Sequence, residues 1–136
     1  MRILAIILVS LAAALFSDPG QSTPDSYTCS GEMALGFKFH EPTRDWIRGK
    51  FETSDFIVVR ESGHWVLNKL HSDMTAPCNS SAHNSGEMIC EQPGIFTFRV
   101  NLDTRRFLYS HYLGYVNGDE HTETPYTEIG LCLKFQ

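Results

Sequence analysis

The sequence is poor in basic residues relative to acidic ones. It holds 11 lysines and arginines against 16 aspartates and glutamates, for a formal net charge of −5. The basic residues are also dispersed, and only Arg105 and Arg106 are adjacent. Nucleic-acid-binding domains normally gather basic side chains on one face or stripe. The composition therefore argues against a nucleic-acid partner, and mild acidity is common for solubility alone.

The sequence also lacks the short motifs of common enzymes. It contains no Gly-x-Ser-x-Gly, no His-Glu-x-x-His and no glycine-rich loop of the kind that cradles phosphate. No stretch shows the three-to-four spacing of apolar residues that an amphipathic helix needs over three turns. These absences favour a β-rich protein and argue against a familiar catalytic centre.

The longest apolar stretch stands at the N-terminus, and only Ser10 interrupts it. Residues 3–16 follow Met1 and Arg2, and small residues and a turn at 18–20 come next. This layout is that of a secretory signal peptide, and the run is short for a transmembrane span. We expect a signal peptide over 1–20, a mobile lead-in over 21–26 and a single disulfide-stapled β domain over 27–136. An uncleaved N-terminal anchor is the alternative.

Only four cysteines are present, and all lie in the part expected to be exported. An even number of cysteines in an oxidising compartment implies two disulfides, with three possible pairings. We favour Cys78–Cys90, which would close the polar loop between them, and Cys29–Cys132, which would tie the first strand to the last. A zinc site is disfavoured because no two cysteines have the Cys-x-x-Cys spacing.

Alternating apolar and polar residues predict strands through most of the remaining chain. The expected strands cover residues 27–40, 46–52, 56–60, 64–70, 88–91, the two halves of 95–116, and 126–135. A three-residue hairpin loop is expected at 61–63 and a long loop, which holds Cys78, at 70–86. Turn residues recur every eight to twelve positions, as in all-β sandwiches and barrels.

The predicted fold is all-β, with about seven or eight antiparallel strands in a small barrel or curved sheet. A link between the first and last strands would hide both sheet edges, which favours the barrel. A β-sandwich is the alternative.

The last strand raises a conflict over which face is buried. Its apolar set predicts an inward face, and Glu128 and Cys132 would then point outward; the set is Ile129, Leu131, Leu133 and Phe135. Cys29, by contrast, lies on the apolar face of its strand, which also carries Met33, Leu35 and Phe37. The Cys29–Cys132 disulfide then needs a bulge at Gly130, or the pairing is wrong.

Glu128 interrupts this otherwise apolar strand. We expect it to face solvent as an ordinary surface residue. If it faces the interior it needs a partner, because an unpaired buried carboxylate is costly, and Arg99 or Arg106 would serve.

Other candidate site residues surround the end of the 95–116 hairpin. His111 stands among aromatic residues and is either a general base or, as we expect, a structural histidine. The loop with Asp119, Glu120 and His121 could hold a cation, but it lacks a complete calcium-loop spacing, so a solvated loop and no metal are expected. Tyr112 and these three loop residues are the predicted contact surface.

Three segments resemble a group of small exported proteins of Gram-negative bacteria. They read YTCSGE at 27–32, TRRFLYSHYLGYVNGD at 104–119 and TPYTEIGLC at 124–132. The group carries a Tyr-x-Cys start and a Thr-Pro-x-x-Glu-Ile-Gly-x-Cys tail, and the resemblance implies export without naming a reaction. A weaker similarity to periplasmic lysozyme inhibitors of the small β-barrel kind implies architecture alone, because a counterpart of their inhibitory loop is absent.

These patterns predict a non-enzymatic, exported β-domain, periplasmic or secreted, that binds a protein or a small ligand in the cell envelope. One alternative is a hydrolase or metal-dependent enzyme with a site at His111 and Glu128. Another is a structural or stress-protective envelope protein. We expect no cofactor, and no stable membrane insertion after signal cleavage.

Overall fold

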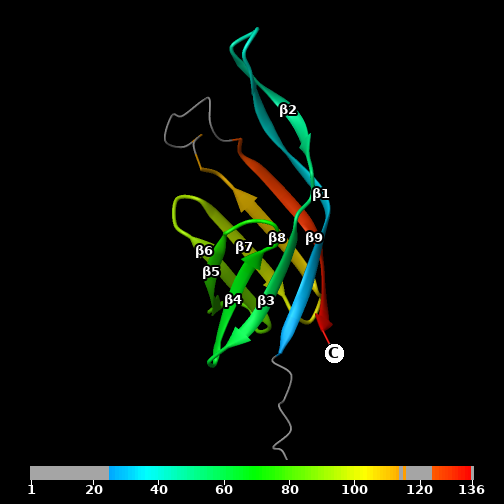
Figure 1. Cartoon of the computed structure of the whole chain (residues 1–136), viewed down its shortest axis with the longest axis vertical. Helices are drawn as coiled ribbons and strands as arrows, with labels where there is room; N and C mark the ends of the chain where they lie inside the picture. The colour runs from blue at the N-terminus through cyan, green and yellow to red at the C-terminus, as the bar shows by residue number, and fades with distance from the viewer. Residues whose placement is uncertain (1–24, 114, 116–123, 136) are drawn as a thin grey trace, which may run out of the picture.

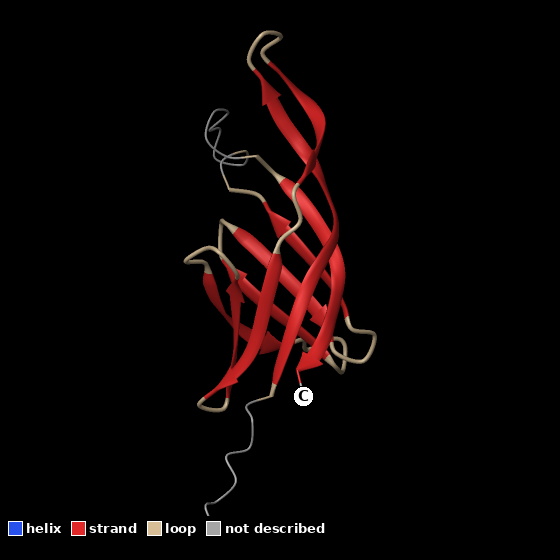
Figure 2. Cartoon of the chain, turned by 45° about the vertical axis from the view of Figure 1, so that its right-hand side comes forward, coloured by secondary structure: helices blue, strands red, loops and turns tan. Residues whose placement is uncertain are grey.

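The computed structural model describes residues 25–113, 115 and 124–135, which form nine strands and no helix (Figure 1, Figure 2). The strands are β1 (Ser26–His40), β2 (Asp45–Phe51), β3 (Asp55–Glu61), β4 (His64–Lys69), β5 (Thr75–Ser80), β6 (Glu87–Gln92), β7 (Phe96–Asn101), β8 (Arg106–His111) and β9 (Tyr126–Phe135). The all-β prediction is confirmed. The expected signal peptide lies outside the described residues.

Eight of these strands close into an antiparallel barrel. The hydrogen-bonded order runs β1-β3-β4-β5-β6-β7-β8-β9, and β9 pairs back onto β1. Closure gives every barrel strand two neighbours and removes the open edges that a flat sheet would expose. The barrel prediction is therefore confirmed, and the sandwich alternative is wrong.

The ninth strand builds an arm outside the barrel. The lower part of β1, from Ser26 to Ser30, pairs with β3, whereas the part from Ala34 to His40 pairs with β2. In the described part of the chain β2 hydrogen-bonds to no other strand. The hairpin of residues 34–51, which we call the arm, therefore projects beyond one end of the barrel (Figure 2).

A β-bulge in β1 divides its apolar residues between two faces. The β1–β9 register shifts between Gly31 and Met33. Below the shift Cys29 is fully buried, and above it Ala34 is the buried residue. The single apolar face predicted for 27–40 is therefore wrong above the bulge, because Met33, Leu35 and Phe37 are about half exposed.

The predicted orientation of β9 is also wrong. Its apolar set, Ile129, Leu131, Leu133 and Phe135, is exposed, whereas Glu128, Gly130 and Cys132 are buried. A Cβ atom at Gly130 would stand 2.5 Å from the Phe107 ring, so this glycine makes room for the ring. The bulge lies in β1 and not at Gly130. The Cys29–Cys132 disulfide needs no bulge at Gly130, because Cys132 is on the buried face of β9.

Both predicted disulfides are present, and each joins directly paired strands. Cys29–Cys132 links β1 to β9, and Cys78–Cys90 links β5 to β6. The loop expected over 70–86 is wrong in its middle, because β5 runs through it. The segment has a proline, Pro77, and little β propensity, but pairing with β4 and β6 on both sides holds it extended.

Of the two predicted hairpin turns, the first is shorter than predicted and the second has the predicted side-chain hydrogen bonds. Between β3 and β4 the loop has two residues and not three, Ser62 and Gly63, both with positive φ as in a type I′ turn. In the turn from β7 to β8, Asn101 Oδ1 accepts hydrogen bonds from the backbone N–H of Asp103 and Thr104 at 3.0 and 2.9 Å, as its turn-forming role predicts.

Aromatic side chains fill the barrel. Phe56 packs against Phe98, Phe107 and Tyr109 with ring centroids 5.1 to 5.6 Å apart. An eight-stranded barrel is just wide enough for side chains to fill it. The interior is accordingly a packed core, and candidate sites must lie on the outer wall or at the barrel ends.

Candidate functional site

The outer wall of β8, β9 and β1 carries a continuous group of exposed apolar side chains. Leu108, Ile129 and Met33 lie in direct cross-strand register over the three strands. We define the apolar face as Leu108, Ile129, Leu131, Leu133, Phe135, Met33 and Leu35, which are 41% to 67% exposed. Scattered exposed apolar residues are normal, but contiguous ones rimmed by polar groups mark interaction surfaces.

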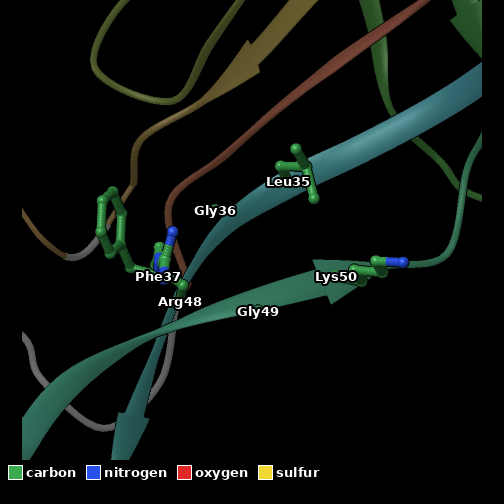
Figure 3. Close-up of a pocket in the computed structure, with 6 residues that line it drawn as sticks. All are labelled: Leu35, Gly36, Phe37, Arg48, Gly49 and Lys50. Atoms are coloured by element: carbon green, nitrogen blue, oxygen red, sulfur yellow. The ribbon is translucent and has the colours of Figure 1, made fainter.

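The apolar face continues onto the arm as a groove (Figure 3). Leu35 and Phe37 lie on β1, and their cross-strand partners on β2 are Lys50 and Arg48. The groove has a volume of about 490 Å³. It therefore places apolar side chains of β1 beside cationic side chains of β2.

Cations border the apolar face on both sides. Arg106 of β8 is paired with Leu131, and Arg48 and Lys50 stand on β2. On β8, β9, β1 and β2, the side chains that point to the same outer side as the apolar face include no carboxylate except Glu32, the bulge residue. This surface is thus positively rimmed in a chain of net charge −5.

Arg99, on the next strand, is already neutralised. It binds Glu87 through Nη2 at 2.7 Å and Nε at 2.9 Å. Hydrogen bonds from Asn84 and then Arg99 lower the pKa of Glu87. Arg99 therefore adds little positive charge to the rim.

Glu128 is fully buried, which corrects the outward prediction. Its Oε1 accepts a hydrogen bond from the backbone N–H of Ser54 at 2.6 Å, so neither Arg99 nor Arg106 is its partner. Its Oε2 has no hydrogen-bond partner among the described residues. Burial raises the pKa of this carboxyl, and the Ser54 hydrogen bonds and the charge of Lys69 oppose the rise.

His111 and Glu128 come to the same end of the barrel, on adjacent strands. His111 is in register with Tyr126 and stacks on its ring at 5.5 Å, while Glu128 is in register with Tyr109. Glu128 directs one oxygen to a backbone amide, and no hydrogen bond among the described residues joins the side chains of His111 and Glu128, the pair named in the alternative enzyme hypothesis. The arrangement brings the residues near each other but does not form a nucleophile–base pair.

Of the predicted contact residues, only Tyr112 is described. Its backbone N–H donates to Ile95 O at 3.0 Å, and its hydroxyl lies 3.4 Å from Thr97 Oγ1. Asp119, Glu120 and His121 lie outside the described residues. Of the predicted contact surface the structure therefore places one residue, which contacts β7 and the last residue of the turn before it.

Sequence reasoning missed the apolar face because it assigned those residues to the core. One signal could have revealed it. The favoured Cys29–Cys132 pairing required Cys132 to share the buried side of β1, and that placed Ile129 and Leu131 outside. The cysteine pairing was a better guide to orientation than the hydrophobicity of the strand.

Comparisons with protein-family models, with curated proteins and with solved structures found no match for the chain. No helix in the described ranges is long and apolar enough to span a membrane. Within the same ranges, no three His, Cys, Asp or Glu side chains are grouped so as to hold a metal ion. The surface itself must therefore carry the functional argument.

Proposed function

We propose that this chain is an exported binding protein that docks another protein on its apolar face. The observation that carries the proposal is the run of exposed apolar side chains across β8, β9 and β1. Two disulfides are consistent with an oxidising compartment, and we place the protein in the periplasm or outside the cell. The closed, cross-linked barrel would present the face as a rigid surface.

Charge indicates the chemistry of the partner. The rim offers Arg106 on one side and Arg48 with Lys50 on the other. A partner with an apolar ridge flanked by carboxylates would satisfy both features. A second copy of this chain fits less well, because a two-fold dimer on this face would bring cationic rims together.

Site-specific photo-crosslinking in the exporting cell tests the proposal. A photoreactive phenylalanine analogue replaces Leu131 at the centre of the apolar face. The matched control replaces Ile47, which is equally exposed at 45% but lies on the opposite face of the arm. We expect a discrete adduct with a different protein from position 131 and none from position 47.

A binding measurement with the cross-linked protein, once purified, completes the test. Burying a leucine contributes about 1.5–3 kcal/mol, so Leu131→Glu should weaken the complex at least tenfold, and Ile47→Glu should not. Adducts containing only this chain would indicate self-association, and binding to anionic vesicles without a protein adduct would indicate a lipid surface. Either result, or equal labelling from both positions, contradicts protein docking on this face.

A further inference from the structure

A second hollow lies at the base of the arm, where the arm meets the mouth of the barrel. It has a volume of about 550 Å³. Its walls come from β1, from the end of β2 with residues 52–54, and from β4 and β9. We call it the mouth pocket, and it is lined by Lys38, Lys50, Phe51, Glu52, Thr53, Ser54, Lys69 and Tyr126.

Positive charge is concentrated in this pocket. The chain has four lysines, and three of them, Lys38, Lys50 and Lys69, line it; Glu52 is the one carboxylate among the described lining residues. None of the three ammonium groups forms an ion pair in the part of the chain that the structure describes. The fourth lysine, Lys134, is at the other end of the barrel and pairs with Asp25 at 3.0 Å.

Aromatic rings of the pocket contact two of the three ammonium groups, those of Lys38 and Lys69. Lys69 Nζ donates to Tyr126 Oη at 3.2 Å, and Lys38 Nζ stands 4.7 Å from the centroid of the Phe51 ring. Phe51 and Tyr126 stack on each other, with centroids 4.9 Å apart and planes 17° apart. An ammonium group has three donor hydrogens, so these contacts leave donors for a ligand.

Glu128 lies behind this pocket and is a second carboxyl group near the lysines, besides Glu52. The backbone N–H of Ser54, which lines the pocket, donates to its carboxylate. Burial raises the pKa of Glu128, so this carboxyl is neutral over a wider pH range than an exposed glutamate. The lysines therefore dominate the electrostatics of the pocket.

We infer that the mouth pocket binds a small organic anion with a flat apolar body, of the aryl carboxylate class. The anionic group would take hydrogen bonds from Lys38 and Lys69, and the body would lie against the ring edges of the Phe51–Tyr126 pair, whose faces are covered by each other, by Lys38 and by His111. Pockets of this size bind small molecules by apolar contact and a few placed polar groups. The proposal of this pocket does not rest on the proposed docking of a protein on the apolar face.

Calorimetric titration of the disulfide-intact protein tests the inference with three probes. The probes are 2-naphthoate, its uncharged isostere 2-naphthamide, and inorganic phosphate, which has charge but no apolar body. We expect 2-naphthoate to bind at least about tenfold more tightly than either of the others. Lys38→Met and Lys69→Met should each weaken 2-naphthoate about tenfold, and the control Lys134→Met should change it less than about twofold.

Several results would overturn the inference. These are equal binding of the amide, equal binding of phosphate, unchanged binding by both pocket variants, and no 2-naphthoate binding up to about 10 mM. Leu131→Glu separates the two sites, since loss of binding in this variant would place the probe on the apolar face. If Lys69→Met does not fold, Lys38→Met still decides, because Lys38 is exposed and stands outside the core.

Discussion

The buried carboxyl of Glu128 should make the stability of the fold fall as pH rises. Its folded pKa is raised above its ordinary value of 4.5, mainly by burial. Between that value and the raised one, the folded chain binds more protons than the unfolded chain, so the free energy of unfolding decreases with pH. Glu128→Gln removes this titration, and the variant should lose this part of the pH dependence.

The structure sets the size of the effect. Above the folded pKa the native protein carries an ionised group that accepts hydrogen bonds from Ser54 and whose Oε2 has no partner among the described residues. A buried charged group in this state costs more than about 1–3 kcal/mol, and an amide at the same place costs less. We therefore expect Glu128→Gln to gain about 1–2 kcal/mol relative to the native chain between pH 4 and pH 8.

Urea unfolding followed by tryptophan fluorescence measures this difference directly. Native and Glu128→Gln proteins are unfolded at several pH values, and only the difference between the two curves is interpreted. Glu87 has a lowered pKa, so it gives stability that is lost as pH falls through the folded value, and this effect cancels in the difference. A difference that is flat from pH 4 to 8, or one that favours the native chain at high pH, would refute the reasoning.

Two further predictions concern the barrel frame. Replacing Cys29 and Cys132 by alanine should lower the free energy of unfolding by about 4.7 kcal/mol, and replacing Cys78 and Cys90 by about 3 kcal/mol, because the closed segments span 103 and 12 residues. Urea unfolding of the two double variants measures both losses, and a larger loss from the Cys78–Cys90 pair would contradict the prediction. Gly31→Ala should destabilise by about 1–3 kcal/mol, because the new Cβ would collide with the buried carboxylate behind it. Calorimetric melting checks that loss, and an unchanged melting temperature would show that the carboxylate moves aside.

Much of the frame could be predicted from local pattern. Strand β9 has the predicted bounds, and both disulfides pair as expected. Turn chemistry at Asn101 also appeared as the side chain predicts. These features depend on residues close in sequence or on the small number of ways to pair four cysteines.

The orientation of β9 could not be derived from hydrophobicity alone. Alternation identifies two faces but does not say which is buried when the barrel around the strand is narrow. Here a Cβ atom at the inner position Gly130 would collide with the backbone oxygen of Ser30 and with the Phe107 ring, so this position admits no larger side chain. The larger apolar residues are therefore left outside, and only a three-dimensional volume argument predicts that.

The arm lies between the two proposed sites, because β2 and not β3 pairs with β1 above the bulge. Above the bulge β2 takes the position beside β1 that β3 holds below it, so the arm leaves the barrel wall and keeps two accessible faces. One face carries Leu35 and Phe37 into the groove of the docking surface, and the other carries Lys38 into the mouth pocket. Lys50 lines both hollows. A carboxylate bound at either site would compete for the same ammonium group, so occupancy of one site should lower affinity at the other, and by linkage the effect is reciprocal.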